Sequence, residues 1–257
     1  MDLEKKRIDV IERALDIIEM IAYNSKTLSI RDLAAKTGYS KSSIHRIIKT
    51  LVGKGYINTT KDNVYTLGAK FLLLKSAKNF YASYIEIVSP IAQEIVNTTG
   101  QTVILNVLSG DKGLCIYTLE PRSAVKYVAE VGMTVPFHGG AGGKILLAFA
   151  PDDVRKRFLA NSLAPFTHNT VTESNTLQNQ LDRIRNERLA VSREEFQENA
   201  FAIGTPIFSP CGEFLSSFVI AGPIVALNEN EDFFVKEVKN TEKKINERLS
   251  MLWKFYF

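Results

Sequence analysis

The fold is decided by the segment Ser40-Lys-Ser-Ser-Ile-His-Arg-Ile-Ile-Lys-Thr-Leu51. Its apolar residues recur at i, i+3, i+4 and i+7, the spacing of one buried face of an α-helix, and Ser40 suits the N-cap position. We therefore expect a helix that begins after Ser40 and turns its isoleucines toward a core. The predicted buried face consists of Ile44, Ile47, Ile48 and Leu51.

The opposite face carries short hydroxyl side chains near the start of the helix and cations further along. A helix that enters the major groove of DNA needs this distribution, because small polar groups let its N-terminal end approach bases and phosphates. Taken singly, each of these residues is more often a solvated surface residue, and it is their shared face that favours DNA. We expect base contacts from Ser42, Ser43, His45 and Arg46, and phosphate contacts from Lys41 and Lys49.

A first helix is predicted over residues 10–22, with Asp9 as its N-cap. Ile11, Leu15 and Ile18 form one apolar stripe at i, i+4 and i+7, which we expect to be buried.

A second, shorter helix follows Ser29-Ile-Arg-Asp32, which resembles a capping box with Asp in place of Glu. Gly38 suits the C-terminal stop of this helix, and the tight junction to Ser40 predicts a helix-turn-helix. Ser29 is added to the residues expected to contact DNA.

A hairpin is predicted after the third helix, because two β-rich runs, residues 53–58 and 64–68, flank a polar turn. A hairpin in this position is the wing of a winged helix-turn-helix. Lys61 at its tip is expected to reach a phosphate or the minor groove. Residues 1–68 are therefore predicted to be a winged helix-turn-helix DNA-binding domain.

The charge distribution separates two parts of different character. The chain has 257 residues, 45% of them hydrophobic, and a net charge of +4. Residues 1–78 hold 15 Lys and Arg against 8 Asp and Glu, and the remainder holds 17 against 20, so the first part is basic and the second mildly acidic. A basic segment is typical of a part that meets a polyanion. The composition excludes a disordered or collagen-like chain, and neither a signal peptide nor a membrane span is predicted, so we expect a cytoplasmic protein.

Residues 69–82 are predicted to form a linker helix that is apolar nearly all round. Such a helix either packs on another chain, as part of a dimer interface, or is buried against its own domain. Residues 83–257 alternate strands and helices and predict an α+β domain on one antiparallel sheet. After a helix over 85–98, the expected strands are 102–108, 114–119, 124–130, 191–196, 200–208 and 214–220, and the expected helices are 141–149, 152–160, 174–188 and 231–254.

The segment His138-Gly-Gly-Ala-Gly-Gly-Lys144 resembles a nucleotide-binding loop, but its spacing is one residue short and Ile145 follows the lysine where Ser or Thr is required. What remains is a glycine-rich turn that opens a helix. Either its unpaired backbone N–H groups bind a small anion such as a carboxylate, or its glycines only allow the helix to pack closely on a sheet.

Catalytic groups and metal ligands are not predicted. The three histidines are far apart in the sequence, and no metal-ligand spacing occurs. Cys115 is expected to fill a core and Cys211 to lie in a turn. Glu194-Glu195 is more often a solvated strand end than a pair of general acids. We therefore expect no cofactor and no enzyme activity.

Together these motifs resemble the IclR family of transcriptional regulators over residues 8–227. The family implies a winged helix-turn-helix domain, a linker helix and a GAF-like effector-binding domain. Its members form dimers or dimers of dimers, bind pseudo-palindromic operators, and hold a small organic acid in a pocket on the effector sheet. The resemblance rests on residues 13–18, 28–34, 38–48 and 55–56 in the N-terminal part, and on 131–138, 142–148, 194–196, 206–208 and 221–223 in the C-terminal part.

The resemblance also implies effector-binding positions. Gly140 stands where Thr or another small residue is common, Ala202 replaces a common Cys, and Val219 and Ala221 replace serines found in some members. The pocket is therefore expected to be less polar than in members that bind short keto acids, and to hold a larger or partly apolar acid or a sugar acid. The implied positions are His138, Gly139, Gly140, Ala141, Ser192, Ala202, Val219 and Ala221.

The prediction is therefore a DNA-binding regulator, a repressor of a catabolic operon, that binds duplex DNA as a homo-oligomer and responds to a small organic acid. Two alternatives stay open at this point: an enzyme built on a GAF-like domain, and a ligand sensor that acts through protein contacts.

Overall fold

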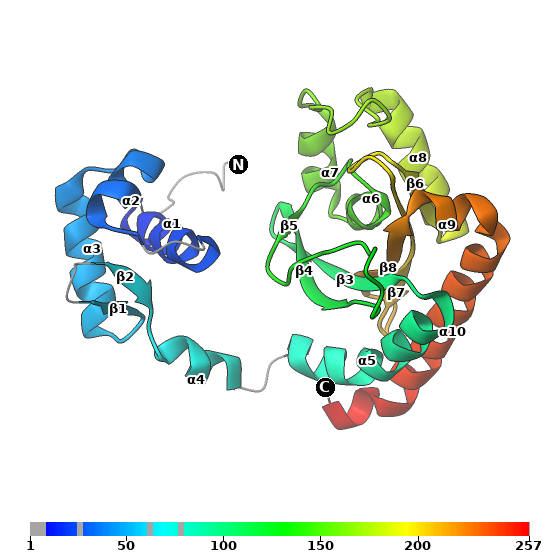
Figure 1. Cartoon of the computed structure of the whole chain (residues 1–257), viewed down its shortest axis with the longest axis horizontal. Helices are drawn as coiled ribbons and strands as arrows, with labels where there is room; N and C mark the ends of the chain where they lie inside the picture. The colour runs from blue at the N-terminus through cyan, green and yellow to red at the C-terminus, as the bar shows by residue number, and fades with distance from the viewer. Residues whose placement is uncertain (1–8, 25–27, 61–63, 77–79, 257) are drawn as a thin grey trace. The chain divides into compact units, whose positions relative to one another are not determined.

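The computed structural model describes residues 9–24, 28–60, 64–76 and 80–256. The chain divides into two compact units, Met1–Lys78 and Asn79–Phe257, and each has its own hydrophobic core (Figure 1). Among the described residues, no helix combines the length and the apolarity that a membrane crossing requires.

The N-terminal unit packs three helices around a small core and adds a two-stranded antiparallel hairpin. Leu33, Ile44 and Ile57, one from each of three successive segments, are almost fully buried in this core. The predicted winged helix-turn-helix is confirmed. Its elements are α1 (Asp9–Tyr23), α2 (Ile30–Thr37), α3 (Lys41–Gly53), β1 (Ile57–Thr59), β2 (Tyr65–Leu67) and α4 (Lys70–Ser76).

Local capping fixes the turn between α2 and α3. The Ser29 hydroxyl accepts from the Asp32 N–H and the Asp32 carboxylate accepts from the Ser29 N–H, so the predicted capping box is confirmed. Gly38 follows α2 with φ 72°, a left-handed conformation that favours glycine. Ser40 caps α3 by accepting from the Ser43 N–H at 3.3 Å.

The predicted buried stripe of α1 is wrong. Ile11 and Leu15 are each 53% exposed, whereas Ile17 and Ile21 enter the core. The helix is apolar on two sides, so the i, i+4 spacing fits either of them. An apolar stripe that also includes Val10 therefore lies on the surface of the N-terminal unit.

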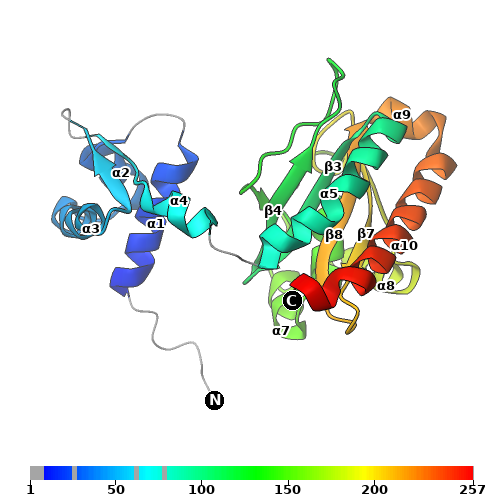
Figure 2. The same ribbon diagram turned by 90° about the horizontal axis from the view of Figure 1, so that it is seen from below.

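The C-terminal unit is built on one six-stranded antiparallel sheet with the order β5-β4-β3-β8-β7-β6. Helices α5 and α10 cover one face of the sheet, and α6 with α7 and α8 covers the other (Figures 1 and 2). The predicted α+β class is confirmed. The strands are β3 (Thr102–Ser109), β4 (Lys112–Leu119), β5 (Thr134–Val135), β6 (Ala190–Arg193), β7 (Ala200–Phe208) and β8 (Phe214–Pro223), and the helices are α5 (Phe80–Thr99), α6 (Ala141–Ala148), α7 (Asp152–Leu159), α8 (Ser174–Glu187), α9 (Ile224–Glu229) and α10 (Glu231–Tyr256).

The structure differs from the predicted elements at three places. Residues 124–130 form an irregular segment instead of a strand, and the sheet is completed by β5, which pairs with β4. The predicted linker helix over 69–82 is too long, because Phe80 already begins α5. The Phe80 ring packs edge-on against Trp253 of α10 with centroids 6.1 Å apart, which holds this start of α5 in the C-terminal unit. Helix α9 was not predicted.

Candidate functional site

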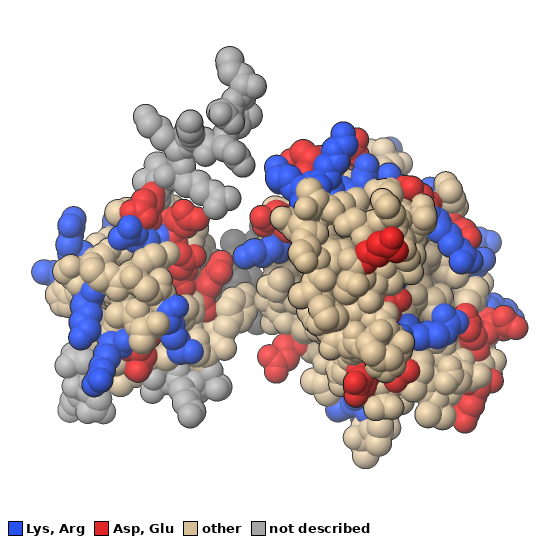
Figure 3. Space-filling model, turned by 90° about the horizontal axis from the view of Figure 1, so that it is seen from above, with Lys and Arg blue, Asp and Glu red and all other residues tan. Residues whose placement is uncertain are grey.

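The exposed face of α3 holds the side chains predicted to contact DNA, while its isoleucines are buried on the opposite side. In Figure 3, lysine and arginine side chains line the left edge of the N-terminal unit, on the side where α3 lies in Figure 1. The helix thus presents a polar and basic face at the surface. Lys41, Ser42, His45, Arg46 and Lys49 are exposed on it, and Ser43 is half-buried.

Arg13 of α1 lies against this surface and was not among the residues predicted to contact DNA. Its guanidinium pairs with Asp9 at 2.7 Å, donates to the Ser43 hydroxyl at 3.4 Å and lies 5.0 Å from the centroid of the Tyr39 ring. The Tyr39 hydroxyl donates to Asp16 at 2.5 Å, and this hydrogen bond raises the pKa of Tyr39. These contacts tie α1 to the start of α3. Only the i, i+4 spacing of Asp9 and Arg13 could have indicated part of the network from the sequence.

Ser29 and Lys61 were also predicted to contact DNA. The Ser29 hydroxyl is engaged in the cap of α2, where it donates to the Asp32 carboxylate at 2.6 Å, and this hydrogen bond lowers the pKa of Asp32. Ser29 is half-buried there. Lys61, predicted at the tip of the wing, lies outside the described residues.

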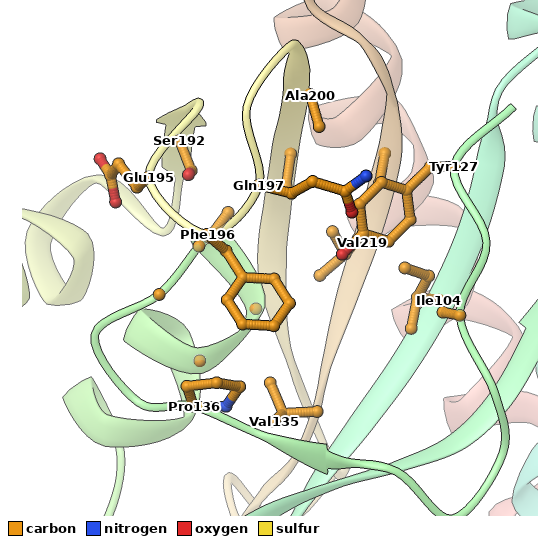
Figure 4. A pocket seen from close by; sticks show the side chains of 18 of the residues that line it. Ile104, Tyr127, Val135, Pro136, Ser192, Glu195, Phe196, Gln197, Ala200 and Val219 are labelled. Atoms are coloured by element: carbon orange, nitrogen blue, oxygen red, sulfur yellow. The ribbon is translucent and has the colours of Figure 1, made fainter. Parts of the chain in front are cut away.

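A cavity lies in the C-terminal unit between the N-terminal end of α6 and the sheet. It encloses about 590 Å³ of empty space, the open mouth included, and therefore has room for a small organic molecule. Apolar side chains dominate its wall, among them Ile104 and Val219 from the sheet (Figure 4).

Two irregular segments form the outer wall. Tyr127 belongs to the segment before β5, and Phe196 and Gln197 belong to the loop after β6. In Figure 4 these three side chains surround the same space. The Thr167 and Thr170 hydroxyls donate to the carbonyls of residues 194 and 195 at 2.5 and 2.7 Å, and therefore hold the start of that loop in place.

The glycines at the start of α6 allow close packing. A Cβ on Gly143 would lie 1.8 Å from the Pro136 carbonyl oxygen, and a Cβ on Gly142 would lie 2.7 Å from Asn106 Nδ2. Gly140 stands at the N-cap with φ 103° and has no side chain to cap the helix. The packing role predicted for this segment is therefore confirmed. The same turn also brings the uncapped, positively polarised end of α6 to the cavity wall.

Seven of the eight positions implied for effector binding line this cavity. His138 is the exception. Its Nε2 lies 2.8 Å from the Ala164 carbonyl oxygen, and its ring lies beside the rings of Phe158 and Phe166. His138 therefore packs behind the helix start and not in the cavity wall. The seven lining positions are Gly139, Gly140, Ala141, Ser192, Ala202, Val219 and Ala221.

A buried ion pair beside the cavity was not predicted. The Lys144 side chain on α6 is 2% exposed, contacts the Glu195 carboxylate and donates to Gln180 Oε1 at 3.0 Å. Desolvation lowers the pKa of Lys144, and the nearby Glu195 carboxylate opposes that shift. Glu195 lines the cavity and is 9% exposed, so the prediction of a solvated strand end is wrong for this residue.

The cysteines and the possible metal ligands add no further site. Cys115 is buried on β4 and Cys211 is exposed in the turn between β7 and β8, so both predictions are confirmed. Burial raises the pKa of the Cys115 thiol to about 11. Within the described part of the chain, no group of three or more His, Cys, Asp or Glu side chains is placed to hold a metal ion.

Two family models match the chain. The model described as the IclR helix-turn-helix domain matches residues 10–60, and the model described as the bacterial transcriptional regulator IclR C-terminal domain matches residues 82–247. The chain belongs to the IclR family. IclR-family proteins are DNA-binding transcriptional regulators and not enzymes, so the enzyme alternative is excluded.

This IclR-family regulator is similar to several relatives over most of its length. It is 29% identical over 204 residues to the HTH-type transcriptional regulator Rv1719 of Mycobacterium tuberculosis, covering 79% of this chain and 78% of the relative. It is 27% identical over 243 residues to the DNA-binding transcriptional repressor YiaJ of Escherichia coli, covering 92% and 86%. The crystal structure of an IclR homolog from Microbacterium hydrocarbonoxydans complexed with 4-hydroxybenzoate shares the fold, with a TM-score of 0.82, 20% identity, and 94% and 99% coverage.

Proposed function

We propose that this IclR-family regulator binds a pseudo-palindromic operator as a dimer or dimer of dimers and represses a catabolic operon. A small organic acid bound in the cavity is the signal that changes the affinity of the regulator for DNA. The regulator acts in the cytoplasm. The observation that carries the proposal is the exposed polar and basic face of α3, which is backed by three buried isoleucines.

On this proposal α3 enters the major groove. Arg46 and His45 reach base edges together with the serines at the start of the helix, and Lys41 and Lys49 bind phosphates on either side. Ser29 and the wing lysine Lys61 are further proposed contacts. A dimer places two such helices on half-sites about 34 Å apart, or a multiple of that distance.

Exposed apolar residues of the N-terminal unit support self-association. Ile11 and Leu15 on α1 and Leu72 and Leu74 on α4 are more than half exposed. Isolated apolar side chains are ordinary on a protein surface, but stripes of them along helices are typical of interaction surfaces. A second copy of the chain covers these stripes in the proposed dimer.

The cavity favours an acid with an apolar body. The carboxylate of the acid would accept hydrogen bonds from the uncapped N–H groups at the start of α6, where the helix dipole favours negative charge. Its apolar part would contact Ile104, Phe196 and Val219, which line the same space. The structural neighbour that holds 4-hydroxybenzoate makes an aromatic acid a suitable first probe.

Control of DNA binding follows from linkage. An effector that binds one arrangement of the dimer more tightly shifts the population toward that arrangement. A tenfold change in DNA affinity requires only about 1.4 kcal/mol of differential effector binding.

The DNA-binding proposal is tested by Arg46→Ala in gel shifts, with a duplex selected from a random pool by the unaltered protein. We expect affinity for that duplex to fall by about 1–3 kcal/mol, and binding of the unaltered protein to weaken as salt is raised. Lys112→Ala is the matched control, because Lys112 is an exposed cation in the C-terminal unit. Unchanged affinity in Arg46→Ala would contradict the assignment of α3 to the groove, and salt-independent binding would favour a sensor that acts through protein contacts.

The effector proposal is tested by thermal shifts with a panel of acids that differ in length and apolar area. We expect stabilisation by aromatic or branched acids. Stabilisation by two- or three-carbon acids alone would refute the proposed ligand class.

A further inference from the structure

The cavity wall contains an acidic residue, which is unexpected beside a site that takes an acid. Glu195 lines the cavity and is buried. A negative charge in a wall of low dielectric repels an anionic ligand much more strongly than the same charge in water. An acid can therefore bind here only if something cancels the charge of Glu195.

Lys144 supplies the opposite charge from the helix that opens at the cavity. Its backbone N–H donates to the Gly140 carbonyl at 3.2 Å and so closes the first turn of α6, the turn whose uncapped end lines the cavity. Its ammonium group contacts the Glu195 carboxylate, and Gln180 of α8 accepts a further hydrogen bond from it at 3.0 Å. The ammonium group is thereby fixed in the position that neutralises Glu195.

The charges next to Glu195 in the sequence have other partners. The Glu194 carboxylate accepts from the Asn199 N–H at 2.8 Å, within the same loop. The Arg193 guanidinium pairs with Glu231 of α10. In Figure 4 the Glu195 carboxylate points away from Phe196 and Gln197, the two side chains that this loop directs into the cavity. Neutralisation of Glu195 therefore depends on Lys144.

We propose that Lys144 is a specificity-determining residue of the effector cavity: by cancelling the charge of Glu195, it lets the cavity bind an acid in preference to the neutral isostere of that acid. The inference rests on the proposed acid effector and deepens it. Lys144 acts through Glu195 and does not itself touch the ligand. The preference of the cavity for acids over neutral molecules is therefore set by the sum of the charges of two residues.

The test compares the affinities of benzoate and benzamide, which have nearly the same shape and differ in charge. Calorimetric titration gives the ratio of the two dissociation constants. It is measured for the unaltered full-length chain, for Lys144→Met, for Glu195→Gln and for the variant with both changes. We expect the unaltered chain to prefer benzoate. Lys144→Met should reduce this preference at least about tenfold, or about 1.4 kcal/mol, because the charge of Glu195 is left uncancelled. Glu195→Gln should raise the preference for benzoate, because the positive charge of Lys144 is then left uncancelled.

The double variant Lys144→Met/Glu195→Gln separates an electrostatic role from a structural one. We expect its preference for benzoate to return to within about threefold of the unaltered chain, because both charges are gone. A merely structural pair would not give opposite effects in the two single variants and a return in the double one. If Lys144→Met does not fold, the rise in Glu195→Gln and its reversal in the double variant carry the same information.

The outcomes distinguish the two levels of the proposal. Equal preferences in all the folded variants, alongside a clear preference for benzoate in the unaltered chain, would overturn the role of Lys144 and leave the acid effector standing. An unaltered chain that binds benzamide as well as benzoate, or binds neither, would count against the acid effector itself and against this inference with it.

Discussion

Replacing Gly143 with alanine tests the close contact between α6 and the backbone of Pro136. A Cβ at this position would lie 1.8 Å from the Pro136 carbonyl oxygen and 2.8 Å from the Pro136 carbonyl carbon. Both are backbone atoms, so no side-chain rotation can relieve the overlap. Either α6 or the segment that leads into it must move.

The expected cost follows from two opposing effects. Overpacking a well-packed site costs about 1–3 kcal/mol, and a clash with backbone belongs at the upper end of that range. Alanine in place of glycine stabilises a helix interior by about 1 kcal/mol, which offsets part of the loss. The net destabilisation is about 2 kcal/mol. For a unit the size of Asn79–Phe257, this corresponds to a fall in Tm of about 4–8 °C.

Differential scanning calorimetry of the full-length chain measures this fall. The matched control is Gly53→Ala, because Gly53 ends α3 and a Cβ there would meet no atom within 4 Å. That variant should leave the transition of the C-terminal unit unchanged and stabilise the N-terminal unit by up to about 1 kcal/mol. If Gly143→Ala unfolds at the same temperature as the unaltered chain, α6 does not approach Pro136 as closely as the structure requires, and the cavity beside it has a different shape.

Three further predictions concern single side chains. Ser40→Ala should destabilise the N-terminal unit by about 1 kcal/mol in urea denaturation, because it removes the N-cap of α3. Ile17→Ala should lower the free energy of unfolding by about 2–5 kcal/mol, because Ile17 is buried in the core. Ile11→Ala should change the unfolding free energy of the monomer by less than about 0.5 kcal/mol and should instead weaken self-association in sedimentation experiments. Equal losses of stability in the two variants would contradict the orientation of α1. Iodoacetamide at neutral pH should label Cys211 in the native protein and Cys115 only after unfolding, as read by peptide mass spectrometry, because burial raises the pKa of Cys115 to about 11 and keeps this thiol protonated.

The parts of the fold that the sequence predicts correctly depend on neighbours within one helical turn. The capping box at Ser29 and Asp32, the left-handed stop at Gly38 and the cap at Ser40 each join residues no more than four positions apart. The buried face of α3 is equally clear, because its other face is fully polar and leaves only one way to orient the helix. The exposed polar and basic face of α3 could therefore be predicted almost residue by residue.

The spacing of apolar residues does not predict the structure correctly where more than one arrangement fits the same spacing. In α1 the stripe with Ile11 and Leu15 and the stripe with Ile17 and Ile21 have the same i, i+4 spacing, and only packing against α2 and α3 selects the second. Residues 127–130 alternate in a strand-like way for a different reason. Tyr127 and Ala129 line the cavity while Val128 between them is exposed, so an irregular wall segment shows the two-residue pattern of a strand.

The cavity in the C-terminal unit is the hardest part to predict, because its electrostatics depend on contacts across the fold. Lys144 follows a glycine-rich turn and Glu195 follows a short strand, and in both contexts a charged side chain is ordinarily solvated. Their pairing requires that α6 pack on the sheet beside the end of β6, which in turn requires the order β8-β7-β6 to be in place. No pattern within either segment contains that information. A sequence that preserves every local motif could therefore retain the fold and still lose the proposed preference for acids, if either member of this pair alone were replaced.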